Sequence, residues 1–210
     1  MSLTVQYDTT AVQAILARLP EDLRDKGAQL AVNRTAAKAK TEMRRQIIAV
    51  YNLKSAEVGG ALNTTPASLK KGIFSAALYP TSLSGSKKGR AMNVIHFLES
   101  KTTLADAKRR GKAGTLQQLF FKFKKSGGKK TIQAEGTKSA PFIGNKGRTV
   151  FRRTGKGRTP IEPVQVIDTR QMFNTRSLNE AVLKKAAADL VIESESAVRK
   201  LLADLQAPLK

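Results

Sequence analysis

Apolar residues recur at three- and four-residue steps in three parts of the chain, and this spacing predicts amphipathic helices. The first helix follows a capping cluster at Asp8–Thr10. The second spans about 20–51, with proline and acids in its first turn. The last spans 177–208 and begins with Ser177 and Glu180, which have the spacing of a capping box.

Two stripes of small and aliphatic residues are expected to be the buried faces of the long helices. In the second helix the stripe comprises Val32, Ala36, Ala39, Met43, Ile47 and Val50. In the last helix it comprises Leu183, Ala187, Leu190, Ser194, Val198, Leu201 and Leu205. The first stripe is rich in alanine, so this helix can approach its partner closely. Its cations Arg34, Lys38, Arg44 and Arg45 fall off the stripe and are expected on a solvated face.

The middle of the chain instead carries short runs with strand-type alternation. Strands are expected at 69–79, 93–98, 115–124 and 131–135, with a hairpin loop at 125–130 and short helical segments at 55–62 and 169–174. In the third strand, Phe121 and Phe123 should lie on one face and Lys122 and Lys124 on the other. We expect Met172 and Phe173 to pack inward.

The stretch 140–164 packs glycines and cations between two short β-type runs, 149–151 and 161–166. Glycine permits tight reversal, and Pro160 and Pro163 suit an edge strand. The stretch is either a solvated hairpin with a basic tip or a hairpin that inserts into a neighbouring subunit or lies against an anionic surface.

The order of helices, then a meander of short strands, then one long helix predicts an α+β fold. We expect the N-terminal helices and the C-terminal helix to pack on an antiparallel β-sheet with extended basic loops or a hairpin. The length of 210 residues suffices for a single domain. Its parts would be an N-terminal helical part (1–62), a β-meander with basic loops (68–167) and a C-terminal helix (177–207).

The net charge of +22 is concentrated in the middle of the chain. Between Lys87 and Arg158 the sequence carries 20 of the 38 Lys and Arg residues but only three of the 16 acids, and hence +17 of the +22. Such an excess is more than solubility requires and indicates nucleic acid, an anionic surface or acidic protein partners. The cations expected to contact a partner or DNA are Lys87, Lys88, Arg90, Lys108, Arg109, Arg110, Lys124, Lys125, Lys129, Lys130, Arg148, Arg152, Arg153, Lys156 and Arg158.

The sequence offers little for catalysis. There is no cysteine, and the single histidine, His96, lies in an apolar run where a satisfied structural imidazole is far more common than a general base. The acids are scattered, so no metal site is expected. The Gly/Lys loops match neither the phosphate-loop nor the dinucleotide pattern. We therefore expect no enzyme activity and no cofactor, and see neither a signal peptide nor a membrane span.

The basic loops have three possible meanings. Clustered Lys and Arg without interleaved aromatics favour non-sequence-specific contact with the DNA backbone. Stacking on single strands is less favoured, because the few aromatics look like core residues. The loops could also dock onto acidic protein rings, or simply be solvated.

Several segments together resemble the minor tail protein Z family of long-tailed phages and their prophages. They are Ala31–Met43, Tyr51–Lys54, Ala140–Ile143 and Val150–Ile161, and the likeness extends from about Leu30 to Leu205. No single motif is diagnostic, but their order and spacing make the match moderately specific. The loops at 87–130 are longer and more basic than the family pattern.

The resemblance implies a structural virion protein at the head-proximal end of a phage tail. There it would complete the tail, support head–tail joining and help to position or pass the DNA end. The implied partners are a tail terminator, tail tube and head-completion proteins, with a homo-oligomeric ring for which a hexamer is expected, and double-stranded DNA backbone. The implied location is the virion tail, assembled in the host cytoplasm. The alternative is a cytoplasmic, non-sequence-specific nucleic-acid-binding or architectural protein.

Overall fold

The computed structural model describes residues 9–71, 75–81, 92–98, 119–131, 141–145, 148–155, 157 and 159–206. The chain forms two compact units. The first, called the helical unit below, combines 1–47, 59–81 and 170–210, and the second, called the β unit, combines 48–58 and 82–169. The α+β class predicted from the sequence is confirmed.

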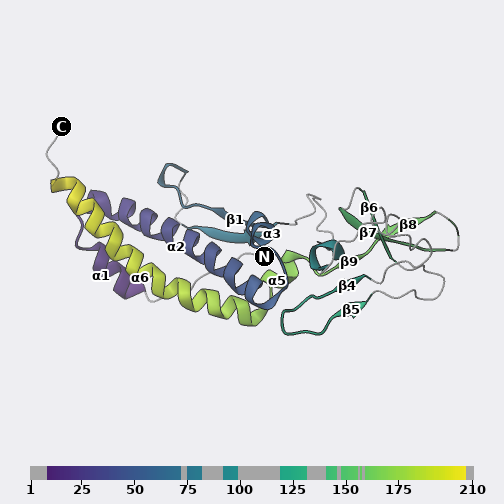
Figure 1. Cartoon of the computed structure of the whole chain (residues 1–210). Coiled ribbons are helices and arrows are strands. Elements are labelled where there is room, and N and C mark those ends of the chain that lie inside the picture. Colours follow the sequence, from purple (N-terminus) through teal and green to yellow (C-terminus); the bar gives the residue numbers. More distant parts are fainter. Residues whose placement is uncertain are drawn as a thin grey trace. The chain divides into compact units, whose positions relative to one another are not determined.

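The helical unit is built on the predicted helices. Helix α1 (Thr9–Leu16), helix α2 (Glu21–Val50) and helix α6 (Arg176–Gln206) appear side by side in Figure 1. Their apolar side chains form two clusters, one around Val12, Ala31, Leu190 and Ala197 and the other around Ile15, Leu19, Val198 and Leu201. The long helices therefore pack on each other.

The predicted capping box of α6 is wrong. The helix begins at Arg176, and the N–H groups of Leu178 and Asn179 both donate to the carbonyl of Thr175. Glu180 accepts a hydrogen bond from the Arg176 guanidinium, 2.7 Å away, one turn earlier on the same helix. Because Ser177 already lies inside the first turn, it is not the capping residue.

The predicted buried stripes are correct in one half of each long helix. In α2, Met43 and Ile47 are buried, but Ala31 and Thr35 are buried in place of Val32 and Ala36. In α6 the residues from Leu190 to Leu201 follow the prediction. Its first half instead buries Val182 and Ala186, one residue before the predicted Leu183 and Ala187, and Leu205 near its end is exposed.

The helical unit also contains a pair of strands. Strand β1 (Leu62–Thr65) pairs antiparallel with strand β2 (Ala77–Pro80). The backbone of Ala67 beside them exchanges hydrogen bonds with the Asn33 side chain on α2. The prediction of a strand over 69–79 is wrong at its start, because Leu69–Lys71 form a 3₁₀-helix, η1, and β2 is only as long as its four-residue partner. Helix α3 (Ser55–Gly60), predicted to run to Leu62, precedes β1.

The described residues of the β unit form three small sheets rather than the single sheet that the sequence suggests. Strands β6 (Phe142–Gly144), β7 (Thr149–Arg153) and β8 (Ile161–Pro163) form an antiparallel sheet with β7 in the centre. Strand β8 is an edge strand, as its prolines predict. In the turn after β6, Asn145 has a φ of 51°, so a residue other than glycine adopts the left-handed conformation there.

The strand predicted at 93–98 is mostly a 3₁₀-helix. Strand β3 (Met92–Asn93) is paired with β9 (Gln165–Val166), η2 (Val94–Phe97) follows, and Leu98 after it is extended again. The Asn93 carboxamide oxygen accepts hydrogen bonds from the N–H groups of Ile95 and Val150, while its amide donates to the Val150 carbonyl. This side chain caps η2 and thereby ends the strand.

The third sheet is the predicted hairpin. Strand β4 (Phe120–Phe121) pairs antiparallel with β5 (Lys130–Thr131), with Phe121 opposite Lys130. Within the described part of the predicted strand at 115–124, the strand is thus shorter than expected. Its antiparallel pairing with the following strand is confirmed. Helix α5 (Thr169–Phe173) buries Met172 and Phe173, as predicted.

Candidate anion-binding hairpin

The segment Leu119–Thr131, called the cationic hairpin below, gathers five lysines and no acid. The lysines are Lys122, Lys124, Lys125, Lys129 and Lys130. All of them except Lys122, which is half-buried, are exposed. The alternation predicted from the sequence holds. Leu119 and Phe121 are buried, whereas Phe120 between them is exposed, and so is Lys124 further along the chain. The hairpin therefore concentrates positive charge on a short, ordered segment.

Backbone hydrogen bonds hold the hairpin on the side away from β5. The N–H of Lys122 donates to the Phe97 carbonyl, 3.0 Å away, and Leu98 forms a bridge with Phe121. The N–H of Lys125 donates to the Val50 carbonyl at 2.9 Å, at the end of α2. In turn the Asn52 N–H donates to the Phe123 carbonyl at 2.8 Å. These bonds place the lysine side chains on a backbone that is fixed at several points.

Three phenylalanine rings form the packed side of the hairpin. The Phe123 ring meets the Phe97 ring edge-on at a centroid distance of 5.0 Å and the Phe121 ring at 4.7 Å. Phe97 is fully buried. Edge-to-face pairs of this kind add about 0.5–1.5 kcal/mol each to the burial of the rings. The prediction that Phe121 and Phe123 share one face is confirmed.

The predicted arginines of the β6–β7–β8 sheet have different surroundings. Arg152 is paired with Glu162 directly opposite on β8. The Arg153 guanidinium carbon lies 5.5 Å from the centroid of the Phe142 ring, a cation–π contact. Arg148 is exposed in the turn before β7. Two of these three cations thus take part in contacts within the sheet.

The structure describes seven of the predicted contact residues. It brings Lys124, Lys125, Lys129 and Lys130 together in the hairpin and puts Arg148, Arg152 and Arg153 on the β6–β7–β8 sheet. The remaining eight lie outside the described residues; they are Lys87, Lys88, Arg90, Lys108, Arg109, Arg110, Lys156 and Arg158. Sequence reasoning missed two hairpin residues, Lys122 and Phe120, although the strand alternation already set Lys122 beside Lys124.

His96 has a carboxylate partner. Its Nδ1 lies 2.9 Å from Oε1 of Glu57, a residue of α3, and Oε2 of Glu57 accepts a hydrogen bond from the backbone N–H of Lys54. His96 lies in η2 rather than in the predicted strand. The pair links α3 to η2, and the Phe97 carbonyl of η2 accepts the hydrogen bond from the Lys122 N–H of the hairpin.

Other kinds of site have less support. Among the described residues no group of three or more His, Cys, Asp or Glu could hold a metal ion. Within the described helices, none has the length and apolar character needed to cross a membrane.

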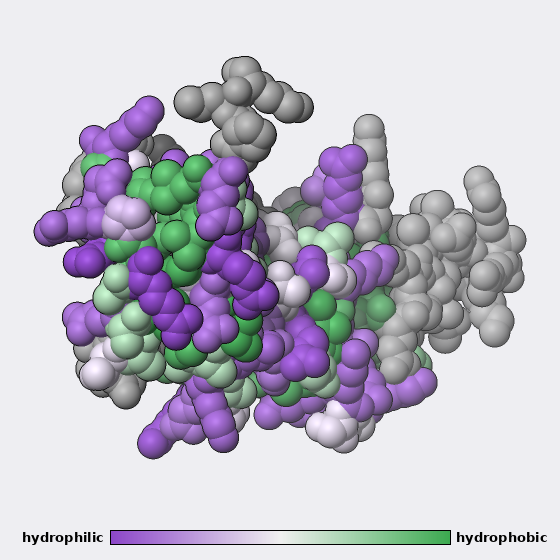
Figure 2. Space-filling view, turned by 90° about the vertical axis from the view of Figure 1, so that its left-hand side faces the viewer, coloured by the Kyte–Doolittle hydropathy of each residue, from purple (hydrophilic) through white to green (hydrophobic). Residues whose placement is uncertain are grey.

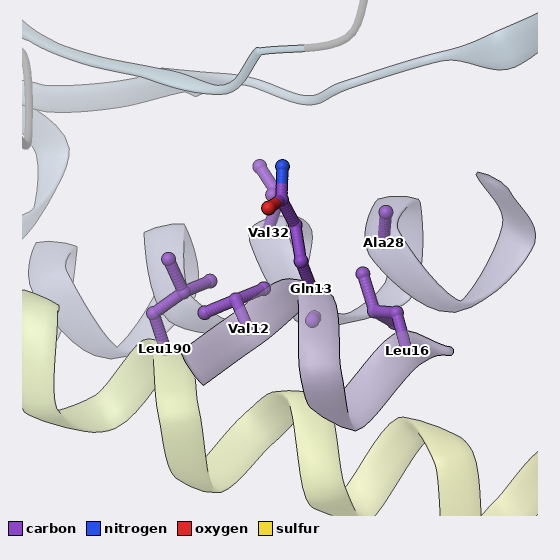
Figure 3. A pocket seen from close by; sticks show the side chains of 7 residues that line it. Val12, Gln13, Leu16, Ala28, Val32 and Leu190 are labelled. Carbon is purple, nitrogen blue, oxygen red and sulfur yellow. The ribbon is translucent and has the colours of Figure 1, made fainter. Parts of the chain in front are cut away.

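The helical unit contains an apolar pocket of about 140 Å³ between α1, α2 and α6. Figure 3 shows Val12 and Leu16 of α1 pointing into it, with Leu190 of α6 at one side and Ala28 of α2 at the other. Gln13 is its only polar lining residue. Figure 2, which views the side where α1 lies in Figure 1, shows apolar surface there surrounded by hydrophilic side chains. The pocket is partly open to solvent. Its lining lacks several converging polar groups of the kind that would select a ligand.

Comparison of the chain with protein-family models, with curated proteins and with solved structures finds no match. The function must therefore be argued from the residues themselves.

Proposed function

We propose that the chain is a structural virion protein of a long-tailed bacteriophage. It acts at the head-proximal end of the tail, where it completes the tail, supports head–tail joining and helps to position the DNA end. The observation that carries this proposal is the cationic hairpin, an anchored segment with five lysines and no acid. The resemblance of four segments, in order along the chain, to the tail protein Z family supports the phage assignment.

A cationic segment with a fixed backbone is well suited to bind an anionic partner at the same position in every subunit of an assembly. Because Phe97, Val50 and Asn52 hold the hairpin by backbone hydrogen bonds, little backbone freedom is lost when a partner binds. The anionic partner is DNA or the acidic surface of a neighbouring neck or tail protein. In a homo-oligomeric ring, proposed as a hexamer, each subunit would present one such hairpin. The role is structural and non-catalytic.

The same hairpin favours a second candidate, a cytoplasmic protein that binds nucleic acid without sequence preference. The two candidates differ in what they predict without nucleic acid. A neck protein assembles with tail proteins or forms rings, whereas a cytoplasmic binder stays a small oligomer whose affinity for DNA falls steeply with salt.

The test is negative-stain electron microscopy of particles produced by a host strain in which this gene is deleted. The proposal predicts full heads beside separate tails of normal length. Complementation with the wild-type gene should restore joined particles. Intact, infectious virions from the deletion strain would overturn the proposal.

A hairpin variant with Lys124→Gln, Lys125→Gln and Lys130→Gln tests the contact itself. It should restore joined particles much less well than wild type, by about tenfold or more in infectious titre, since several charge contacts are lost together. The matched control is Lys26→Gln, Lys184→Gln and Lys200→Gln, three exposed lysines of α2 and α6. Both variants remove three charges, so an equal defect in both would mean that total charge matters rather than the hairpin.

A further inference from the structure

One aromatic ring of the cationic hairpin is not part of its packed side. Phe120 remains 44% exposed, although it follows the buried Leu119 and precedes the buried Phe121. An exposed aromatic ring beside cations offers a flat face on which a nucleic-acid base can stack. Strand alternation already puts position 120 on the face opposite to Phe121 and Phe123.

The lysines flank this ring. Lys122 and Lys124 follow Phe120 at two-residue steps, and the rings of Phe121 and Phe123 that alternate with them contact each other. Thr131 lies directly opposite Phe120 in the antiparallel pair and therefore on the same face. An exposed ring thus lies close in the chain to two cations and opposite a hydroxyl side chain.

We infer that the cationic hairpin binds single-stranded nucleic acid, with a base stacked on the Phe120 ring and the lysines on the flanking phosphates. This inference rests on the proposed function, since it names the partner of the same hairpin. A base in the middle of a duplex has both faces covered by its neighbours and cannot stack on a protein ring. A single strand, or an unpaired end, offers a free base face beside its phosphates. Acidic protein surfaces would use the lysines but give the ring no specific partner.

The test is fluorescence anisotropy of the full-length protein with three labelled probes of about 15 nucleotides, a length that covers one such site. The probes are an oligo-dT strand, an abasic strand with the same phosphates, and a duplex. Wild type should bind oligo-dT about tenfold more tightly than either other probe at the same salt concentration.

Phe120→Ala should lose about tenfold in affinity for oligo-dT and keep its affinity for the abasic strand, and Phe120→Tyr should bind as wild type does. The matched control is Ile161→Ala, an exposed apolar residue of similar exposure, 46%, on β8 of the same unit. It should bind all probes as wild type does. Circular dichroism of each variant confirms that it is folded.

The outcomes separate this inference from the proposed function. Equal binding of oligo-dT and the abasic strand, unaffected by Phe120→Ala, would overturn stacking and leave a phosphate-contacting hairpin. Absence of binding to every probe would also overturn it, with an acidic protein as the partner that remains. In both cases the deletion experiment still decides the virion role. Joined virions without the gene, together with Phe120-dependent binding of oligo-dT, would retain the inference and reject the phage assignment.

Discussion

The helical unit and the cationic hairpin differ in the acidic residues that surround their cations. On α2, Arg34 and Lys38 both contact Glu193 of α6, a carboxylate whose side chain is only 11% exposed. Arg45 contacts Glu42 on its own helix, and Lys185 contacts Asp189 on α6. The hairpin sequence contains no acid at all. Cations in the helical unit therefore help to fix a packing arrangement, whereas the hairpin carries its cations with no acid in its own sequence.

The two regions also differ in what they bury. The helices meet through small residues, since Ala31 and Ala197 are almost fully buried in one cluster. The hairpin instead rests on large rings, with Phe97 at its base. Three substitutions test whether each region depends on these features.

The largest effect is expected for Phe97→Ala in the β unit. Removing a fully buried ring that contacts Phe123 should lower the free energy of unfolding by about 3–5 kcal/mol. Urea denaturation followed by circular dichroism measures this loss. The matched control, Phe120→Ala, removes a ring that is already 44% exposed and should cost less than about 1 kcal/mol. Equal losses would mean that the hairpin does not depend on its packed rings.

The long helices were predictable because their signal is local. Apolar spacing over about thirty residues belongs to one continuous segment, so the predicted bounds of α2 and α6 are nearly correct even though the capping box predicted for α6 is wrong. Which residues face the partner was less predictable. Ala31 and Thr35 are buried where Val32 and Ala36 were expected, because spacing within one helix does not fix which of two adjacent residues meets the partner.

The short strands were poorly predictable because their bounds depend on distant partners. Strand β3 ends where the Asn93 side chain binds the backbone of Val150, and nothing near Asn93 in the sequence announces this contact. The hairpin was partly predictable. The charge count indicated its lysines, and strand alternation indicated that Phe121 and Phe123 pack on the same face. The exposure of Phe120 and the anchoring carbonyl of Phe97 follow only from tertiary contacts.

A second, smaller effect is expected for Ala197→Leu on α6. Ala197 is fully buried against Ala31 and its neighbours, so the larger side chain must displace them. Overpacking of this kind costs about 1–3 kcal/mol, and thermal or urea unfolding would register it. Ala188→Leu provides the control, because Ala188 is exposed on the same helix. If Ala197→Leu were as stable as this control, the close helix contact would not be a requirement of the fold.

The smallest effect is expected for Glu42, the acidic partner of Arg45 in an ion pair of the helical unit. The pKa of Glu42 lies below its ordinary value of 4.5. The main cause is the hydrogen bond that its carboxylate accepts from the Arg45 guanidinium. A hydrogen bond from the Gln46 amide lowers the pKa further, while burial opposes the shift. A carboxylate with a lowered pKa in the folded state stabilises the fold above its unfolded pKa. This contribution is lost as the pH falls through the folded pKa.

Glu42→Gln should therefore cost up to about 1 kcal/mol at neutral pH, because Arg45 is largely exposed and solvent screens the pair. The difference from wild type should shrink as the pH falls below about 4.5. A carboxyl-carbon NMR titration checks the cause directly, since Arg45→Met should raise the pKa of Glu42 toward its ordinary value. A Glu42 that titrates at its ordinary value in the wild type would show that this pair does not fix the helix as argued. The contrast between the ion pairs of the helical unit and the acid-free sequence of the hairpin would then rest on Glu193 and Asp189 alone.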